Sequence, residues 1–245
     1  ATYEKPTAAD HFVGKYGADL LRLWASSIDY TTDVPFSEEI FTRLGDTYRR
    51  IRNTLRILHG NLNDFESGNL EASKDSTLVD RWILERLDEV IATCRSAYEK
   101  FEFHKVYHAL NQFCAVDLSS LYIDITKDRM YCDAPESPHR RQTQAAMREI
   151  FDALCSLLAP VLVFTAEEAW RHSATTSVHL QEFPHSQARG RNAIAQIEHL
   201  LRLRGIIGQA IERARQDKVI GNTLEARVVL NSDSDVTEKI PKEEL

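Results

Sequence analysis

The amino-acid sequence predicts an all-α fold, a helical bundle followed by a short, truncated α/β segment. Apolar residues return every three or four positions over several long stretches, which is the period of an amphipathic helix. Signals that begin or end helices, such as Ser before Glu-Glu and Pro after an apolar run, stand at the ends of these stretches. Only residues 178–184 and 224–230 favour extended structure instead.

The first third of the chain predicts three helices. Residues 6–17 form a short helix closed by a glycine, and residues 18–27 form a second one. The third helix begins after Ser37, whose hydroxyl can accept a hydrogen bond from a free amide of the first turn, and it runs to about Leu62. The inward face of this third helix is predicted to comprise Ile40, Leu44, Tyr48, Ile51, Leu55 and Leu58.

The middle of the chain continues the bundle. A stretch rich in Asn, Asp, Ser and Gly, residues 60–76, is predicted to be a loop. Thr165 followed three residues later by Glu168 predicts a capping box at the start of a short helix that ends near Arg171. The long helices between these two points are predicted over residues 78–100, 103–130 and 138–158, with prolines after the second and third.

The last third of the chain changes character. Helical periodicity is lost over residues 173–190, where an extended segment is expected to close over the bundle, so we place a domain boundary there. Residues 194–216 are again amphipathic, and residues 224–230 read as a strand. A single strand does not make a stable sheet, so the end of the chain is expected to lean on a neighbour or on sequence missing here.

Composition limits the classes of protein that fit. The 245 residues, 43% of them hydrophobic and 27% charged, can form one large or two modest domains. No apolar run approaches the roughly 20 residues that span a bilayer. The sequence shows no basic and then apolar leader pattern and opens with Ala1 rather than Met, so we expect a cytoplasmic piece of a longer protein. The four cysteines form no C-x-x-C pair, which argues against zinc and disulfides.

A stripe of basic and amide side chains runs along the third predicted helix. Arg49, Arg52, Asn53 and Arg56 share one side of it, next to the apolar face. Arginine suits bidentate phosphate contacts, and asparagine can read a base edge, so the stripe could lie along RNA. From the pattern alone, however, a solvated face with pairing between neighbouring turns is the better interpretation.

A second basic group follows residue 190, with Arg202 and Arg204 as its candidates for RNA contact. Acidic residues alternate with it, so RNA binding and pairing within the helix remain equally open. The formal net charge of −7 means that any RNA binding must use local patches.

Polar residues interrupt the apolar repeat of residues 107–131. We expect Asp117, Ser119 and Ser120 to make structural hydrogen bonds inside the bundle, because no base accompanies them to form a catalytic triad. The neighbouring apolar positions predicted to face the core are Phe113, Val116, Leu121, Ile125 and Met130.

Several of these segments together resemble one family over almost the whole chain. The pairing of Asp117-Leu-Ser-Ser120 with Lys127-Asp-Arg129 is similar to the helical domain of bacterial-type isoleucyl-tRNA synthetases. Five further segments agree, in the order of that family: Lys15 to Trp24, Tyr48 to Thr54, Gly60 to Phe65, Thr165 to Trp170 and Gly221 to Ala226. The first and fourth of them are shared loosely with the valine, leucine and methionine relatives.

The resemblance implies a class Ia anticodon-binding domain whose partner is tRNA(Ile) and which acts as a monomer. Residues 1–36 would then connect to the catalytic domain, 37–172 form the bundle, 173–190 a linker and 191–245 a truncated helix-strand subdomain. In this family the first long helix faces the anticodon arm, which favours RNA contact by Arg49, Arg52, Asn53 and Arg56, with Arg202 and Arg204 as secondary candidates.

The resemblance also implies that the parent enzyme attaches isoleucine to its tRNA with ATP, and that it needs magnesium and zinc. The family's His-x-Gly-His and Lys-Met-Ser-Lys-Ser motifs do not occur here, so we expect no catalytic residue, cofactor or metal ion in this chain. Two alternatives remain: the equivalent domain of a valine or methionine synthetase, and a helical protein-interaction scaffold without an RNA role. The acidic net charge would suit the scaffold better.

Overall fold

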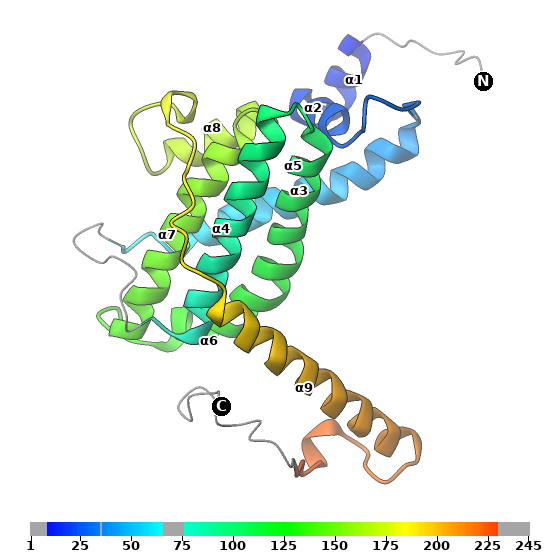
Figure 1. Ribbon diagram of the computed structural model, residues 1–245, viewed down its shortest axis with the longest axis vertical. Helices are drawn as coiled ribbons and strands as arrows, with labels where there is room; N and C mark the ends of the chain where they lie inside the picture. Colours follow the sequence, from blue (N-terminus) through cyan, green and yellow to red (C-terminus); the bar gives the residue numbers. More distant parts are fainter. Residues whose placement is uncertain (1–8, 35, 66–75, 230–245) are drawn as a thin grey trace.

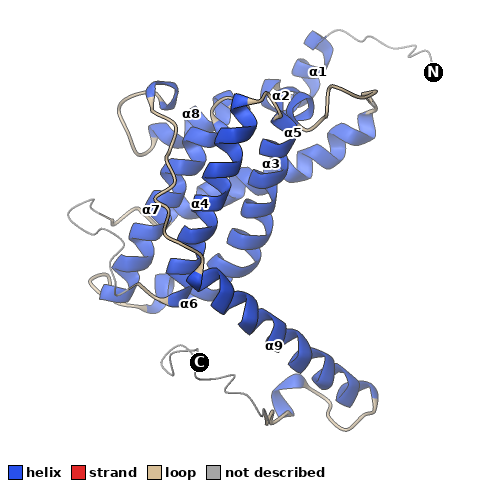
Figure 2. Ribbon diagram, in the orientation of Figure 1, coloured by secondary structure: helices blue, strands red, loops and turns tan. Residues whose placement is uncertain are grey.

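The structure is a computed structural model that describes residues 9–34, 36–65 and 76–229. All regular secondary structure in these ranges is helical, as Figure 2 shows, which confirms the predicted all-α bundle. The main helices are α1 (Ala9–Tyr16), α2 (Ala18–Ser26), α3 (Glu38–Gly60), α4 (Leu78–Glu99), α5 (Phe103–Gln112), a π-helix (Phe113–Tyr122), α6 (Ile123–Cys132), α7 (Pro138–Leu158), α8 (Val163–Arg171) and α9 (Asn192–Gln216).

Helix α4 is the centre of the bundle, in contact with α5, the π-helix, α7 and the first turns of α9. Helix α3 crosses behind α4, α5 and α7 in the view of Figure 1 and packs on α2, α7, α8 and the π-helix. Both helices carry continuous apolar faces, whose burial is the main favourable term in folding. The innermost side chains include Phe41, Ile51, Leu58, Ile83, Leu87, Phe113, Tyr122, Ile150 and Phe151.

Helix α3 forms as its sequence predicts. The Ser37 hydroxyl accepts a hydrogen bond from the amide of Ile40 at 3.4 Å, so the helix begins at the predicted cap. Four of the six predicted inward residues are buried, and Ile40 and Tyr48 are half-buried against the same core. The opposite side of α3 is thereby left facing solvent.

The predicted helix over residues 103–130 is continuous but not uniform. Its middle, Phe113–Tyr122, is wound as a π-helix, in which each amide bonds to the carbonyl five residues before it. The hydroxyls of Ser119 and Ser120 donate to carbonyls at the same separation, at 2.7 and 2.8 Å. These side-chain bonds support the wider turns.

This wider winding corrects the predicted core face of the segment. Val116 and Ile125 were predicted to point inward but are 46% and 47% exposed. Because a π-helix advances by more residues in each turn than an α-helix, the buried face shifts away from the positions that an α-helical period selects. The buried residues are Phe113, Cys114, Asp117, Leu118, Tyr122, Thr126 and Met130.

Helix α8 begins before the predicted capping box, which is therefore wrong. Thr165 lies inside the first turn, and the residue before the helix, Leu162, provides no capping side chain. The carboxylate of Asp19 in α2 caps the helix instead: it accepts hydrogen bonds from the amides of Phe164 at 3.3 Å and Thr165 at 2.7 Å. The Thr165 hydroxyl also donates to it at 2.6 Å. The cap comes from 145 residues away in the sequence.

Replacing Asp19 with alanine is expected to destabilise the protein by about 1–3 kcal/mol, because buried donors at the start of α8 lose their acceptor. Amide hydrogen exchange at Phe164 and Thr165 should speed up, and the melting temperature should fall. Asp10→Ala changes an exposed carboxylate in the first turn of α1 and serves as the matched control. Equal exchange rates in both variants would show that Asp19 does not hold α8.

Carboxylates of α4 fix the segment that precedes α9. Asp88 accepts hydrogen bonds from the amides of Gln187 at 2.9 Å and Arg189 at 3.0 Å. Glu85 accepts from the amides of Ala193 at 3.1 Å and Ile194 at 2.8 Å, and so caps α9. The segment thus closes over the bundle as predicted, although residues 178–180 form a 3₁₀ turn in it. The division into domains remains a prediction.

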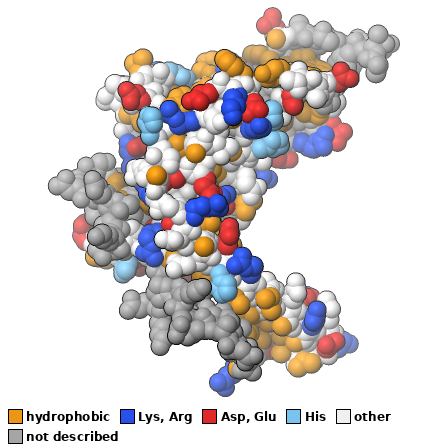
Figure 3. All heavy atoms as spheres, in the orientation of Figure 1, with side chains coloured by type: hydrophobic (Ala, Val, Ile, Leu, Met, Phe, Trp, Pro, Cys, Tyr) orange, Lys and Arg blue, Asp and Glu red, His pale blue; other side chains and the backbone are white. Residues whose placement is uncertain are grey.

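Helix α9 follows its prediction, but only its first turns are buried. Beyond Ile197 it projects away from the bundle, as Figure 1 shows, and hydrophobic side chains line the projecting part in Figure 3. The strand predicted over residues 224–230 is wrong for 224–229, which form a 3₁₀ turn and irregular backbone. A strand requires a neighbouring strand, and the described part of the chain provides none. Residues 66–75 and 230–245, to which the predicted loop and strand extend, lie outside the described residues.

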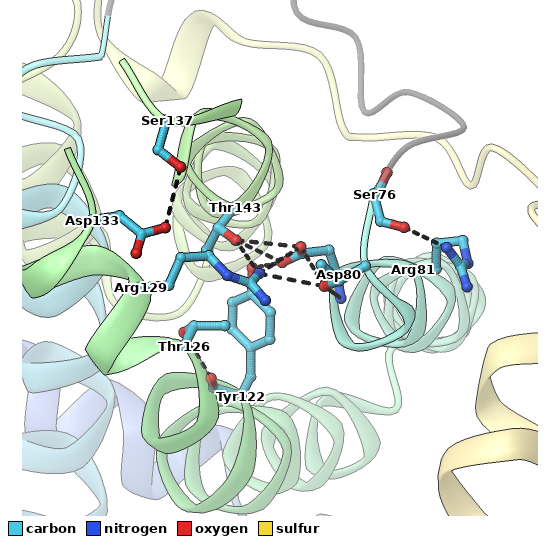
Figure 4. Close-up of polar contacts among 10 residues, drawn as sticks. Ser76, Asp80, Arg81, Tyr122, Thr126, Arg129, Asp133, Ser137 and Thr143 are labelled. Atoms are coloured by element: carbon cyan, nitrogen blue, oxygen red, sulfur yellow. Dashed lines mark hydrogen bonds and ion pairs between the residues drawn. The ribbon is translucent and has the colours of Figure 1, made fainter. Parts of the chain in front are cut away.

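A buried polar network joins α4, the π-helix, α6 and α7 (Figure 4). Its centre is the fully buried carboxylate of Asp80, which accepts hydrogen bonds from the hydroxyls of Tyr122 at 2.8 Å, Thr77 at 2.7 Å and Thr143 at 3.2 Å. Arg129 completes it with an ion pair at 3.2 Å. Burial, and then the nearby Asp80 charge, raise the pKa of the Tyr122 hydroxyl well above its usual value, so Tyr122 acts as a donor.

Candidate nucleic-acid interface

The predicted stripe on α3 is fully on the surface. Arg49, Arg52, Asn53 and Arg56 are all exposed, but their surroundings differ. Arg49 forms an ion pair with Asp46, one turn before it on the same helix. Among the described residues, Arg56 has no ion-pair partner and Asn53 makes no side-chain hydrogen bond. Pairing between neighbouring turns therefore holds for Arg49, and for Arg52 only through a long hydrogen bond of 3.5 Å from its Nη1 to the Tyr48 hydroxyl.

Arg52 pairs with a different helix. Its Nη2 atom donates to both carboxylate oxygens of Glu168 in α8, at 2.8 and 2.9 Å. The guanidinium and carboxylate side chains are 51% and 57% exposed, so water reaches both of them. This contact bridges the outer edges of α3 and α8.

A groove of about 340 Å³ lies between these two helices, and we call it the α3–α8 groove. Three of the four predicted α3 residues line it, while Arg49 does not. Spacings of four and three residues place Arg52, Arg56 and His59 on one side of α3, toward the groove. The lining residues are Arg52, Asn53, Leu55, Arg56, His59, Thr165, Glu168, Ala169 and His172.

The same contacts that build the bundle hold the floor of the α3–α8 groove. The hydroxyls of Tyr48 in α3 and Thr165 in α8 lie 2.9 Å apart, and Thr165 is also held by Asp19. On the other flank of α3, the hydroxyls of Thr54 and Ser119 lie 3.2 Å apart. Helix α3 is therefore fixed on both flanks, and its outward side chains have a stable base.

The groove combines groups that suit a polyanion. Two guanidinium groups face one carboxylate, and the rings of His59 and His172 lie 5.3 Å apart at its end. Guanidinium groups bind phosphate oxygens through parallel hydrogen bonds, and imidazole rings can stack on bases. Sequence reasoning missed His59, His172 and the position of Glu168. The spacing of His59 from Arg56 was the only signal available for any of them.

The expected structural contacts inside the bundle are confirmed for Asp117 and Ser119 but not for Ser120. Asp117 is buried and forms an ion pair with Arg86 at 3.1 Å. Burial raises the pKa of the Asp117 carboxyl above its ordinary value, and the Arg86 charge offsets part of this rise. Ser119 contacts Thr54, whereas Ser120 is exposed and bonds only to its own helix.

The second basic group is not brought to the α3–α8 groove. Arg202 and Arg204 are exposed on α9, which packs mainly on α4. Within the described residues neither forms an ion pair. Lys127 lowers the pKa of the exposed Asp124 carboxyl in α6, and Arg204 contributes a smaller lowering, so Arg204 lies toward α6. The two basic surfaces are thus separate.

No helix in the described part of the chain is long and apolar enough to cross a membrane. No group of three or more His, Cys, Asp or Glu side chains in residues 9–34, 36–65 and 76–229 is arranged to hold a metal ion.

Comparisons with known proteins agree with this architecture. The family model described as the anticodon-binding domain of tRNA ligase matches residues 80–230, which take in α4 to α9. An isoleucine–tRNA ligase of Methylacidiphilum infernorum is 46% identical over 222 residues, which cover 89% of this chain and 24% of that protein. An isoleucine–tRNA ligase of Syntrophotalea carbinolica is 43% identical over 236 residues, 94% of this chain and 26% of that protein.

Among solved structures, the fold is similar to that of a LeuRS from Agrobacterium radiobacter K84 in a ternary complex with tRNA and LeuAMS. The TM-score is 0.54 at 19% identity, over 75% of this chain and 21% of that one. The chain spans about a quarter of the length of the curated relatives that it matches. By its family match over more than half its length, the chain belongs to the family of anticodon-binding domains of tRNA ligases.

Proposed function

We propose that this chain is the part of an isoleucine–tRNA ligase that binds the anticodon arm of tRNA(Ile). The observation that carries the proposal is the α3–α8 groove, in which Arg52 and Arg56 project together from a firmly held helix. The similarity to isoleucine–tRNA ligases along about nine-tenths of the chain supports the choice of tRNA.

Each residue of the α3 stripe has a chemical role in this proposal. Arg49, Arg52 and Arg56 supply charged hydrogen bonds to phosphate oxygens, which position the RNA without reading its sequence. Asn53 has both a donor and an acceptor in its side-chain amide, so it can contact a base edge or a ribose hydroxyl. Arg202 and Arg204 on α9 provide secondary phosphate contacts.

The activity of the whole protein belongs to the same proposal. A complete ligase of this kind would join isoleucine to its tRNA with ATP, and would require magnesium and zinc. It would work as a monomer in the cytoplasm. We assign no catalytic residue and no metal or cofactor ligand to this chain.

Titration of the chain with labelled tRNA(Ile) and with a valine tRNA, followed by fluorescence anisotropy, tests the proposal. We expect a saturable complex with tRNA(Ile) that weakens strongly between about 50 and 200 mM salt, because counterions are released from phosphates. The valine tRNA should bind more weakly. Binding that does not saturate, or that ignores salt, would contradict the proposal.

A protein-interaction scaffold is the second candidate, favoured by the apolar residues on the projecting part of α9. The side chains of Leu201 and Ile206 are 40% and 65% exposed. Exposed apolar side chains that gather on one element can mark a surface that binds another protein. The same titration separates the two functions, since a scaffold has no reason to form a salt-dependent complex with tRNA.

A further inference from the structure

We infer that the α3–α8 groove binds one RNA phosphate. In the absence of RNA, Glu168 pairs with Arg52, and the bound phosphate replaces Glu168 as the partner of Arg52. The inference rests on the proposed function, because the phosphate belongs to the bound RNA. It adds a residue that opposes binding to those that promote it.

The ion pair between Arg52 and Glu168 can be broken easily, so that Arg52 can change partners. Both side chains are about half exposed, at 51% and 57%, and exposed ion pairs are stabilised only weakly because water competes for each charge. A phosphodiester carries one negative charge and two free oxygens, as a carboxylate does. It can therefore accept the two hydrogen bonds that Arg52 now donates to Glu168.

A phosphate bound in the groove can form more charged contacts than Glu168 forms. Arg56 lies one turn along α3 from Arg52, lines the same groove, and has no ion-pair partner among the described residues. A phosphate between the two arginines would contact both guanidinium groups. Among the described residues, Glu168 contacts only Arg52.

Among the described residues, Glu168 has no structural contact other than its bridge to Arg52. The neighbouring Glu167 holds the chain after α8 through Arg171, Ser177 and the amide of Val178. Within the described part of the chain, by contrast, Arg52 is the sole polar partner of Glu168. A carboxylate so placed neutralises one of the two arginines of an RNA-binding groove, so RNA must displace it.

Replacing Glu168 with glutamine tests this directly, because the substitution removes the charge and keeps the size. We expect Glu168→Gln to bind tRNA(Ile) about two- to fivefold more tightly than the wild type, since RNA no longer has to break an exposed ion pair. Glu99→Gln is the matched control: it makes the same change in net charge at an exposed position in the last turn of α4.

The coupling between the two residues provides a second readout. In an Arg52→Met background, Glu168→Gln should tighten binding no more than Glu99→Gln does, because the ion pair is already absent. An equal gain in both backgrounds would overturn the inference, since Glu168 would then act only through its general charge.

The outcomes also separate the inference from the proposed function. If the wild type binds tRNA(Ile) and Glu168→Gln binds it no more tightly than Glu99→Gln, the inference fails and the proposed function stands. If neither the wild type nor Glu168→Gln forms a saturable, salt-dependent complex, the proposed function fails and the inference fails with it.

Discussion

Replacing Asp80 with alanine is expected to destabilise the bundle by about 3–5 kcal/mol, because it leaves a partly buried charge and several buried hydroxyls without their common partner. The Asp80 carboxylate is fully buried and joins residues from α4, the π-helix, α6 and α7. The penalty is therefore the cost of unsatisfied polar groups and not merely of lost contacts.

Urea unfolding followed by circular dichroism measures this effect. In a separate thermal melt, the expected loss of unfolding free energy corresponds, for a chain of this size, to a fall of roughly 6–20 °C in melting temperature. Asp128→Ala is the matched control, because Asp128 is exposed on α6 next to Arg129 and should change stability by less than about 0.5 kcal/mol. A loss below about 1 kcal/mol for Asp80→Ala would show that the network does not hold the bundle together.

The parts of the fold that were predictable from the sequence depend on neighbours in the chain. The cap at Ser37 and the inward stripe of α3 follow from residues within one or two turns of each other. The helices predicted over residues 78–100 and 138–158 follow from the same local patterns, and the structure ends the first at Glu99 and the second at Leu158.

The errors have a common physical cause, which is contact between residues distant in sequence. The start of α8 is set by Asp19, far away in α2, so Thr165 and Glu168 form no capping box. Val116 and Ile125 were misplaced because the hydroxyl bonds of the π-helix change the period locally. A strand at residues 224–229 would need a partner strand, which local propensity does not reveal.

In the candidate site, too, features set by neighbours in the chain were predictable from the sequence, and features set by distant contacts were not. That Arg52, Asn53 and Arg56 share one side of a helix was readable from spacing alone, and the structure places them along one groove. That Glu168 faces Arg52, and that His172 closes the groove opposite His59, depends on how α8 packs on α3. Spacing within a helix predicts a stripe, whereas only tertiary packing shows what the stripe faces.

Removing both groove arginines is expected to weaken tRNA binding by roughly 100-fold or more. In the double variant Arg52→Met and Arg56→Met, two charged hydrogen-bonding groups are lost while the apolar stems remain, and charged hydrogen bonds are each worth about 1.5–3 kcal/mol. Stability should change little, because both side chains are exposed. The matched control is Arg202→Met with Arg204→Met, which removes the same charge from α9.

The dependence of tRNA(Ile) affinity on salt is the most direct test that α3 carries the RNA interface. Each lost phosphate contact lowers the slope of log affinity against log salt by about 0.7–0.9 units. We predict that the slope of the Arg52→Met, Arg56→Met variant falls by about 0.7–0.9 units, because the two arginines share one phosphate, and that the α9 control falls by less. An unchanged slope in the α3 variant, together with a full loss in the α9 control, would place the interface on α9 and contradict the account.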